Sequence, residues 1–545
     1  MSNMIVCPEP LAARAGEEIY AAGGNAIDAA IAAAFVQGVT NPLLCGIGGT
    51  ALLYYHDHSR REPVAMNGEV CIGSQPGPPN WADEYVGRAE TIGRYILSSE
   101  ANQIGYQSVM VPGFVKVCWD AWRRFGSGRL KWADLLQPAI HHARLGFEVY
   151  PYIAAFWRPG VGSDAHDSRP GYPGLHLKLR ATDGASRFYL KPDGSPYETG
   201  DTLVQPEYAN TLQQLADAGG DDFYTGEIAR EAMKDFAYHD GLISADDLSD
   251  YTVIDQSIVR TDYHGYDITS PGPPSSGVQL LEILNILKRL DLDKLGHNSV
   301  EFIDTVARVQ RASFSDNVVL KGMDFDDAEE FVNQVLSDER ATHWAERISS
   351  GDRVVIRGGA IDPGTTHLTA IDEQRNVVSF THSIGSLAGS GVVTPGLGFL
   401  WNNFLGHFNP LPGMPDSIVP GKRLGGLLPV IAFEDGNPAI GIGAPGGSRI
   451  ITAVAQALVN AIDFGMDMQT AVNAPRFHSE EEQLVFLEPT LPEQIVDGLR
   501  ERGCDVQRST YMSRVQAIRV ADDGELEAGA DPRGGAGVGI YPRPA

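Results

Sequence analysis

The peptide bond between Gly364 and Thr365 is one that the chain could cleave itself, through attack by the Thr365 hydroxyl on the Gly364 carbonyl. A threonine hydroxyl is a weak nucleophile unless a base lies beside it. One available base is the residue's own α-amine, whose pKa as a free N-terminus is about 7.7–8.0. Cleavage before Thr365 would create that amine, and Gly364 offers the least hindered carbonyl for attack. Because threonine is common in strands, Thr365–His367 is also compatible with an ordinary strand start.

Gly446 and Gly447 could supply a second group that such chemistry needs. The pair follows a predicted strand, Ala439–Ala444, and precedes a long apolar segment, Arg449–Phe464, that is typical of a helix. Backbone amides at a helix N-terminus are well placed to stabilise the negative oxygen of a tetrahedral intermediate. A glycine turn between strand and helix is also ordinary in proteins without such a role. The pair is therefore a candidate oxyanion hole, with a purely structural turn as the alternative.

Two other motifs point less clearly to chemistry. Gly46–Ala51 matches the GxGxxA form of a dinucleotide-binding loop, but it follows a predicted helix and precedes a predicted strand, the wrong order for that fold. His56–His58 lies in a predicted polar turn with no third ligand at a suitable spacing, so we interpret it as solvated. GxSxG, GxxxxGK[ST] and HExxH motifs are absent from the sequence. We therefore expect no cofactor and no metal.

The surrounding sequence indicates which elements would hold these residues. Hydrophobic periodicity and glycine or proline punctuation predict both helices and strands. In chain order these are helices at Leu11–Ala22 and Ala26–Gln37, a strand at Thr50–Tyr55, a mainly helical stretch with loops at 112–330, and strands at Thr365–Ile371 and Val377–Thr381. Asp372–Asn376 would be the turn that joins the last two strands into a hairpin.

Composition and charge narrow the class of protein. The 545 residues are 43% hydrophobic and 21% charged, which is typical of a globular chain with several cores or one large α/β body. A formal net charge of -28 would repel nucleic acid and anionic membranes, and we expect neither as a partner. The five cysteines are widely spaced and form no CxxC pair, which favours a reducing compartment over a disulfide-bonded secreted protein.

Targeting signals are also not evident. Residues 1–8 lack the basic and apolar regions of a secretory signal. The most apolar run, Ala26–Val36, contains Asp28 and is far shorter than the ~20 residues that span a bilayer. We therefore expect a cytoplasmic protein without a membrane anchor.

Nine short segments, taken in chain order, resemble signature sequences of the γ-glutamyltranspeptidase family. They are Gly23–Ala30, Gly46–Gly49, Gly200–Gln205, Pro273–Gly277, Thr365–His367, Leu400–Asn403, Pro445–Ile451, Asn473–His478 and Asp531–Arg533. Each segment alone is a weak indication, but nine in the same order are specific. The resemblance covers nearly the whole chain.

The resemblance implies an α/β (α+β) fold, namely a four-layer αββα sandwich of the N-terminal-nucleophile hydrolase type with a mainly helical part in the large subunit. It also implies a proenzyme that cuts itself between Gly364 and Thr365. The products would be a large subunit, residues 1–364, and a small subunit, residues 365–545, which interlock as one globular body. Thr365 would then carry the acyl group of an acyl-enzyme. Ser383 matches the family's second hydroxyl beside the nucleophile, and Gly446 and Gly447 match its oxyanion hole.

Several positions depart from the family's pattern for holding a glutamate head group. The family's arginine clamp corresponds to Gly68, and its other head-group ligands correspond to Gly385, Gly396, Gly406 or His407, Gly425 and Gly426. A zwitterionic head group needs a cation for its carboxylate and carbonyls or anions for its ammonium, and losing such partners weakens binding strongly. The short stretch between Asn403 and Gly421 further predicts a reduced lid and a more open site.

The sequence thus predicts an amidohydrolase or acyltransferase that cleaves an amide bond of a small acidic acyl donor, such as an oxamate-like acid or a dicarboxylic monoamide. Water or an amine would be the acceptor. His382 and His407, beside the family's pocket positions, are candidates for binding an acidic group, although histidines that only pack are more common. Two alternatives are a true γ-glutamyltransferase or glutathione hydrolase, and a catalytically silent binding protein on the same scaffold. Assembly into a higher oligomer is also possible.

Overall fold

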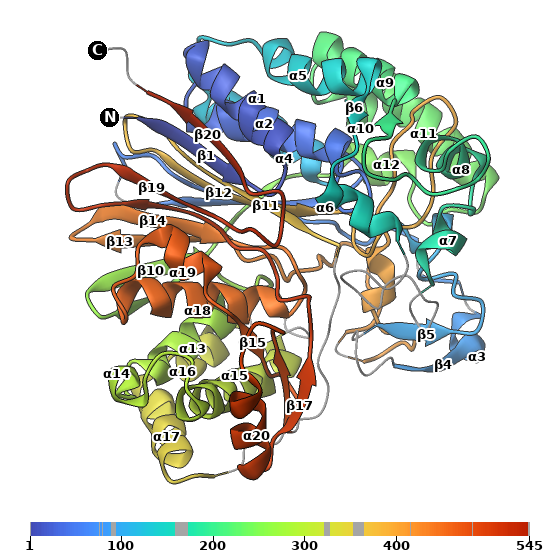
Figure 1. Cartoon of the computed structure of the whole chain (residues 1–545). Coiled ribbons are helices and arrows are strands. Elements are labelled where there is room, and N and C mark those ends of the chain that lie inside the picture. Colours follow the sequence, from blue (N-terminus) through green and yellow to red (C-terminus); the bar gives the residue numbers. More distant parts are fainter. Residues whose placement is uncertain are drawn as a thin grey trace.

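The structure, a computed structural model, describes residues 2–60, 62–75, 77–78, 80–88, 94–158, 173–320, 328–352, 364–414, 416–481 and 483–542. In this part of the chain, two antiparallel sheets lie face to face, and helices cover the outer face of each (Figure 1). The four-layer αββα sandwich is therefore confirmed. Among the described helices, none combines the length and hydropathy needed to cross a bilayer.

The first sheet contains the predicted hairpin. Its strand order is β20 (Gly537–Tyr541), β1 (Asn3–Cys7), β11 (Thr366–Ile371), β12 (Val377–Ser383), β2 (Thr50–His56), β3 (Val64–Gly68) and β8 (Ile254–Gln256). All neighbouring strands are antiparallel. The predicted strands were correct to within a few residues, because their apolar side chains alternate between two buried faces.

The second sheet lies beneath the first. Its strand order is β19 (Leu526–Ala530), β18 (Gln516–Val520), β14 (Asn437–Gly443), β13 (Val430–Glu434), β10 (Tyr266–Pro271) and β9 (Ile258–Tyr263). The prediction of a mainly helical stretch at 112–330 was wrong for β8, β9 and β10. His264 and Gly265 both have positive φ and form the tight hairpin turn between β9 and β10. Edge strand β9 has charged, half-exposed side chains, which weakened its hydrophobic signal.

Helices cover the outer faces of both sheets. Those on the first sheet include α1 (Pro10–Ala21), α2 (Ala26–Thr40), α4 (Phe114–Phe125), α5 (Trp132–Leu145) and α9 (Pro206–Ala218). Those on the second include α13 (Gly277–Leu287), α15 (Val300–Leu320), α17 (Asp338–Ser349) and α18 (Arg449–Ile462). Helix α2 is buried along its whole length, as its alanine-rich sequence predicted. A capping box between Asn25 and Asp28 starts it.

Shorter elements complete the chain. The first group is α3 (Trp81–Glu84), β4 (Tyr85–Arg88), β5 (Tyr95–Leu97), η1 (Tyr106–Ser108), β6 (Phe147–Glu148), α6 (Pro151–Ala154), η2 (Ala155–Trp157), α7 (Leu175–Lys178), α8 (Asp183–Tyr189), β7 (Thr202–Leu203), α10 (Asp222–Thr225), α11 (Glu227–Tyr238) and α12 (Ala245–Ser249). The second group is α14 (Leu292–Leu295), α16 (Ala328–Val335), η4 (Phe404–His407), α19 (Met468–Asn473), β15 (Phe477–His478), β16 (Leu484–Leu487), α20 (Glu493–Glu501) and β17 (Asp505–Arg508).

The space between the sheets is filled by one side of each strand. On β11, Leu368 and Ala370 face the helices, whereas Ile371 joins the core between the sheets. Residues of the same parity as Ile371, including His367, therefore also face the second sheet. This alternation decides on which face of β11 the preceding residue, Thr365, presents its side chain.

Candidate active site

Thr365 lies at the start of β11, directly opposite Ser383 at the end of β12. The register pairs Thr366 with His382, so the next antiparallel pair outward is Thr365 with Ser383. By the parity of the strand, both side chains face the second sheet. The Thr365 hydroxyl donates a hydrogen bond to Ser383 Oγ at 3.4 Å, and both residues are buried. The structure thus brings the predicted nucleophile and the predicted second hydroxyl together.

Ser383 also contacts the peptide bond that precedes Thr365. Its hydroxyl donates a hydrogen bond to the carbonyl oxygen of Gly364, and the amide of Gly385 donates to Ser383 Oγ at 2.9 Å. A Cβ added at Gly364 would overlap the carbonyl oxygen of Gly385, so glycine is required at this position. One hydroxyl therefore contacts both the attacking group and the carbonyl it would attack, which polarises that carbonyl.

The course of β14 brings the segment that follows it to the Thr365 end of β11. A Cβ added at Gly441 would meet Thr369, and one added at Gly443 would meet the ring of His367. Moving two residues toward the C-terminus of β14 thus corresponds to moving two residues toward the N-terminus of β11. Continued at the same rate, the turn after β14 lies beside Thr365.

That turn contains Gly446 and Gly447, whose φ angles of 136° and 62° lie in the region that favours glycine. Helix α18 begins two residues later, at Arg449. Among the described residues, neither glycine amide donates a hydrogen bond, although the Gly447 carbonyl accepts one from Ile450. Two such N–H groups at a helix N-terminus, beside the buried Thr365 hydroxyl, are the arrangement expected of an oxyanion hole.

The glycines at the head-group positions do not simply leave open space. At Gly68, Gly385 and Gly425, an added Cβ would come within van der Waals overlap of other parts of the protein. Gly68, for example, packs against the first turn of α4, where its Cβ would lie 2.7 Å from Val117 Cβ. Only Gly396 and Gly426 have nothing within 4 Å of an added Cβ, and both have positive φ. An arginine clamp therefore could not extend from position 68 without displacing α4.

Of the two candidate histidines, His382 is not brought to Thr365. His382 faces the helix layer, where its Nε2 lies 2.9 Å from Gln37 Oε1, and burial lowers its pKa to about 3. It is therefore neutral at physiological pH and lies on the opposite face of the sheet from Thr365. His407 ends η4 and stacks on Phe404, which belongs to a separate small hydrophobic cluster. The predicted role of His382 in binding an acid receives no support from its position, and that of His407 stays a prediction.

Comparison with known proteins agrees with this geometry. A family profile described as Gamma-glutamyltranspeptidase matches residues 12–541. The chain belongs to this family. As in other members of the γ-glutamyltranspeptidase family, its fold is that of an N-terminal-nucleophile hydrolase, and it is an enzyme of the amidohydrolase and acyltransferase class.

Several members of the γ-glutamyltranspeptidase family align along almost their full length. An "Acylase ACY 1 proenzyme" from Pseudomonas sp. (strain V22) is 35% identical over 538 residues, which cover 97% of this chain and 91% of the relative. The "Glutathione hydrolase proenzyme" of Bacillus subtilis (strain 168) is 29% identical over 569 residues, covering 99% and 91%. The solved structure of a cephalosporin acylase from Bacillus halodurans superposes with a TM-score of 0.86 and 29% identity, covering 98% and 95%.

Within this γ-glutamyltranspeptidase fold, the sequence analysis missed a buried polar network beneath the nucleophile. Glu9 is fully buried and accepts hydrogen bonds from Gln37 Nε2 at 2.5 Å, from Asn41 Nδ2 at 2.6 Å and from the Thr366 hydroxyl at 3.2 Å. Burial raises the pKa of Glu9, and these hydrogen bonds only partly offset that rise. The sequence feature that could have indicated this network is Glu9 itself, a carboxylate between Pro8 and Pro10 that follows an apolar strand. The network fixes the residue that follows the nucleophile.

The signature asparagine pair also has a positioning role that the sequence did not reveal. Asn403 accepts a hydrogen bond from the Ser386 amide at 3.1 Å and donates to the Gln103 carbonyl at 2.9 Å. Buried Lys178 donates to Ser386 Oγ from the opposite side. These contacts hold the backbone immediately after Ser383, including Gly385.

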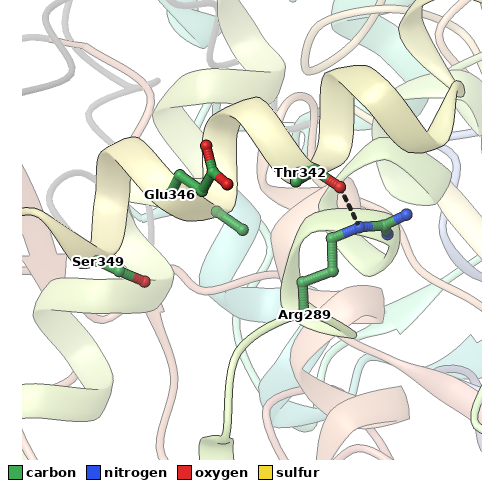
Figure 2. A pocket seen from close by; sticks show the side chains of 5 residues that line it. Arg289, Thr342, Glu346 and Ser349 are labelled. Carbon is green, nitrogen blue, oxygen red and sulfur yellow. Dashed lines mark hydrogen bonds between the residues drawn. The ribbon is translucent and has the colours of Figure 1, made fainter.

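Two hollows in the described surface lie away from Thr365. One of about 390 Å³ opens beside α17 and is lined by Arg289, Thr342, Ala345, Glu346 and Ser349 (Figure 2). Another of about 420 Å³ includes Glu373 and Asn376, at the far end of the β11–β12 hairpin from Thr365. Neither hollow is lined by Thr365, Ser383, Gly446 or Gly447.

Proposed function

We propose that this chain cuts itself between Gly364 and Thr365 and then uses Thr365 to cleave an amide bond of a small acidic acyl donor. The observation that carries the proposal is the Ser383 hydroxyl, which contacts both Thr365 Oγ1 and the Gly364 carbonyl oxygen. The obligatory glycine before Thr365 and the unused amides of the Gly446 turn support the same chemistry.

In the self-cleavage step, Thr365 Oγ1 attacks the carbonyl carbon of Gly364. The C–N bond breaks, an ester forms between Gly364 and the threonine oxygen, and the nitrogen becomes the α-amine of Thr365. Water then hydrolyses the ester, giving a Gly364 carboxylate and a free threonine hydroxyl. Ser383 stabilises the oxygen of the attacked carbonyl through its hydrogen bond.

After this cleavage, residues 1–364 and 365–545 would stay together. Strand β1 of the first fragment pairs with β11 on one side and β20 on the other, and both of these belong to the second fragment. In the second sheet, β10 of the first fragment pairs with β13 of the second. Separation would break these ladders and expose the core between the sheets, so the fragments interlock.

In the amidase step, the Thr365 α-amine accepts the proton from Oγ1 as the oxygen attacks the substrate carbonyl. The amides of Gly446 and Gly447 stabilise the resulting oxyanion, and the amine product leaves with the proton. Water or an acceptor amine then attacks the acyl-enzyme and regenerates Thr365. No step requires a metal or a cofactor.

The substrate class follows from what is missing at the head-group positions. Helix α4 fills the space that an arginine at position 68 would need, and Gly385 and Gly425 are equally closed. Two relatives named as acylase proenzymes, each 35% identical to this chain, and the cephalosporin acylase structure favour an acylase. The second candidate is a glutathione hydrolase, which the relatives of that name favour through their near-complete alignment.

A matched pair of anilides separates these candidates. Glutaryl and γ-glutamyl p-nitroanilide differ only in the α-ammonium group. We expect the mature enzyme to cleave the γ-glutamyl compound at least ~100-fold less well than its best acyl anilide, because an unpaired ammonium loses a charge-assisted interaction. Equal rates, with glutamate as a competitive inhibitor, would establish the glutathione hydrolase. A chain that stays uncut and inactive would instead support the binding-protein alternative.

The proposal has two further features, the location of the protein in the cell and its assembly. The cytoplasmic location follows from the cysteine pattern and stays a prediction, which fractionation of the source cells tests. Assembly beyond the paired fragments also stays a prediction, and the mass of the purified protein in solution measures it.

A further inference from the structure

Arg514 is a buried cation without a salt-bridge partner. The residue is 5% exposed, and no carboxylate lies within ion-pair distance of it among the described residues. Its Nη1 has no hydrogen-bond partner. The guanidinium lies 5.0 Å from the ring centroid of Tyr152 and 5.3 Å from that of Phe156. Aromatic rings alone compensate only part of the cost of burying a charge, so a buried arginine in this state calls for an anion.

Tyr152, whose ring lies under the Arg514 guanidinium, and Tyr150 beside it also have unsatisfied hydroxyls among the described residues. The hydroxyls of Tyr150 and Tyr152 are buried and have no hydrogen-bond partner, and the two ring centroids are 6.3 Å apart. Most buried polar groups in proteins do have partners. A guanidinium and two hydroxyls are all able to donate hydrogen bonds. A carboxylate, which only accepts, matches this set.

The nearest carboxylates of the protein are engaged elsewhere. Glu9 and Asp531 affect Arg514 electrostatically, but neither forms an ion pair with it. Glu9 is held by Gln37 and by other donors of the network beneath Thr365. Asp531 pairs with Arg476 at 2.6 Å. The charge of Arg514 is therefore not neutralised by direct contact.

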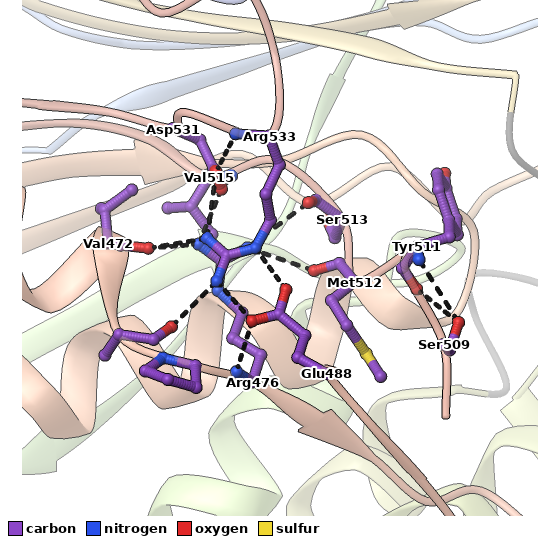
Figure 3. A network of polar contacts seen from close by, with 12 residues as sticks. Val472, Arg476, Glu488, Ser509, Tyr511, Met512, Ser513, Val515, Asp531 and Arg533 are labelled. Carbon is purple, nitrogen blue, oxygen red and sulfur yellow. Dashed lines mark hydrogen bonds and ion pairs between the residues drawn. The ribbon is translucent and has the colours of Figure 1, made fainter. Parts of the chain in front are cut away.

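The backbone on both sides of Arg514 is held rigidly (Figure 3). The Ser513 carbonyl accepts a hydrogen bond from Arg476 at 3.4 Å, and the Val515 amide donates to Asp531 at 2.8 Å. Ser513 has a φ of 65°, which is unfavourable for a residue with a Cβ. Strained backbone that is held by its surroundings is typical of functional sites.

Arg514 also lies beside the turn that contains the proposed oxyanion hole. Its guanidinium is 5.2 Å from the ring of Tyr511, and a Cβ added at Gly446 would lie 2.9 Å from the Tyr511 hydroxyl oxygen. The neighbouring Ser513 hydroxyl donates a hydrogen bond to the Pro445 carbonyl, next to Gly446. Because the register of β14 and β11 brings this turn to Thr365, Arg514 is a candidate to contact an acyl group on Thr365.

We infer that Arg514, with the hydroxyls of Tyr150 and Tyr152, binds the free carboxylate of a short dicarboxylic acyl donor whose amide end is attacked by Thr365. The inference rests on the proposed amidase function and names the group that recognises its acidic substrate. The same subsite disfavours a γ-glutamyl donor, because the ammonium beside the carboxylate would be repelled by the arginine.

The test compares glutaryl p-nitroanilide with its methyl ester, which has the same five-carbon acyl chain but no charge. For the mature Arg514→Met enzyme, we expect the acid-to-ester ratio of kcat/KM to fall about 100-fold, since a charge-assisted bidentate contact is lost. Tyr152→Phe should lower the ratio about 5-fold through loss of one hydrogen bond. Arg519→Met, on strand β18 that follows Arg514, is the matched control and should leave the ratio unchanged.

An unchanged ratio in Arg514→Met, or equal losses on acid and ester, would overturn the inference. If Arg514→Met does not accumulate as folded protein, the double variant Tyr150→Phe, Tyr152→Phe gives the same test. If the wild-type protein cleaves neither anilide, the proposed function fails, but calorimetry with glutarate still tests the subsite. Glutarate should then bind wild-type protein and not Arg514→Met, and absence of binding to wild-type protein would refute the subsite.

Discussion

The end of the first sheet at Thr365 and the buried ion cluster beside it differ in whether their polar groups are paired. Thr365 Oγ1 and the Gly364 carbonyl form hydrogen bonds with an uncharged hydroxyl, and the Gly446 and Gly447 amides are unused among the described residues. In the ion cluster of Arg476, Glu488, Asp531 and Arg533, every member is paired (Figure 3). Arg476 lies 2.6 Å from Asp531, and Arg533 lies 3.1 Å from it.

The contrast separates groups kept for substrate from groups used for structure. Unused donors cost stability and are retained where a reaction needs them, whereas a closed set of charges can stay buried without an external partner. The cluster also holds residues 513–515 beside the proposed site. Substitutions around Thr365 should therefore lower the catalytic rate. Substitutions in the ion cluster should instead lower the free energy of unfolding.

The largest effect is expected at the nucleophile. With residues 1–364 and 365–545 expressed as separate chains, Thr365→Ala should lower kcat by on the order of 10⁴ or more, because no other group can form the acyl-enzyme. Steady-state kinetics on the preferred anilide measure this loss. The free energy of unfolding should change little, and a variant that keeps more than a tenth of the activity would contradict the assignment.

The next largest effect is expected in the ion cluster. Asp531→Asn leaves Arg476 and Arg533 buried without their shared carboxylate, so we expect the free energy of unfolding to fall by about 3–5 kcal/mol. Denaturant titration followed by circular dichroism measures the change. The kcat of the folded fraction should fall far less than for Thr365→Ala. A loss of stability below about 1 kcal/mol would show that the cluster is not structural in this sense.

The pH dependence of stability, measured for the wild-type protein and for Asp531→Asn, gives a control. Burial alone raises the pKa of Asp531, but Arg476 and Arg533 outweigh it, and the net shift of the pKa is downward. A depressed pKa gives stability that is present above the unfolded value of about 3.9 and is lost as the pH falls toward the folded value. Wild-type protein should therefore lose more stability than Asp531→Asn below about pH 4.

A smaller effect is expected at the second hydroxyl. Ser383→Gly removes the group that orients Thr365 Oγ1 without, in the proposed mechanism, removing a substrate contact. We expect kcat to fall about 10–100-fold and KM to change less than 3-fold. The fragments expressed separately give both values independently of maturation. A rise in KM with kcat unchanged would mean that Ser383 binds substrate instead.

The sequence was sufficient where the signal was local. The alternation of apolar residues predicted β11 and β12, and the register of that hairpin then placed Ser383 opposite Thr365. The glycine pair after a strand and before a long apolar segment likewise predicted the turn at Gly446. In each case the residues that specify the element are close together in the chain.

The sequence was insufficient where the partners are distant in the chain. Gly68 was interpreted as a missing clamp, but only the packing of α4 shows that the space is filled. Glu9 contacts Thr366, which follows 357 residues later. Arg514 had no motif at all, and its isolation among aromatic rings is visible only in three dimensions. Domain boundaries stay predictions, because residues 353–363, just before Gly364, lie outside the described part of the chain.

The most direct test of the central claim is the intact mass of the purified protein, followed over time and combined with N-terminal sequencing. The account predicts that the full chain converts to residues 1–364 and 365–545, that the second fragment begins Thr-Thr-His-Leu, and that Thr365→Ala stays whole. Full amidase activity in a wild-type chain that stays uncut would contradict the account, and so would cleavage of Thr365→Ala at the same bond.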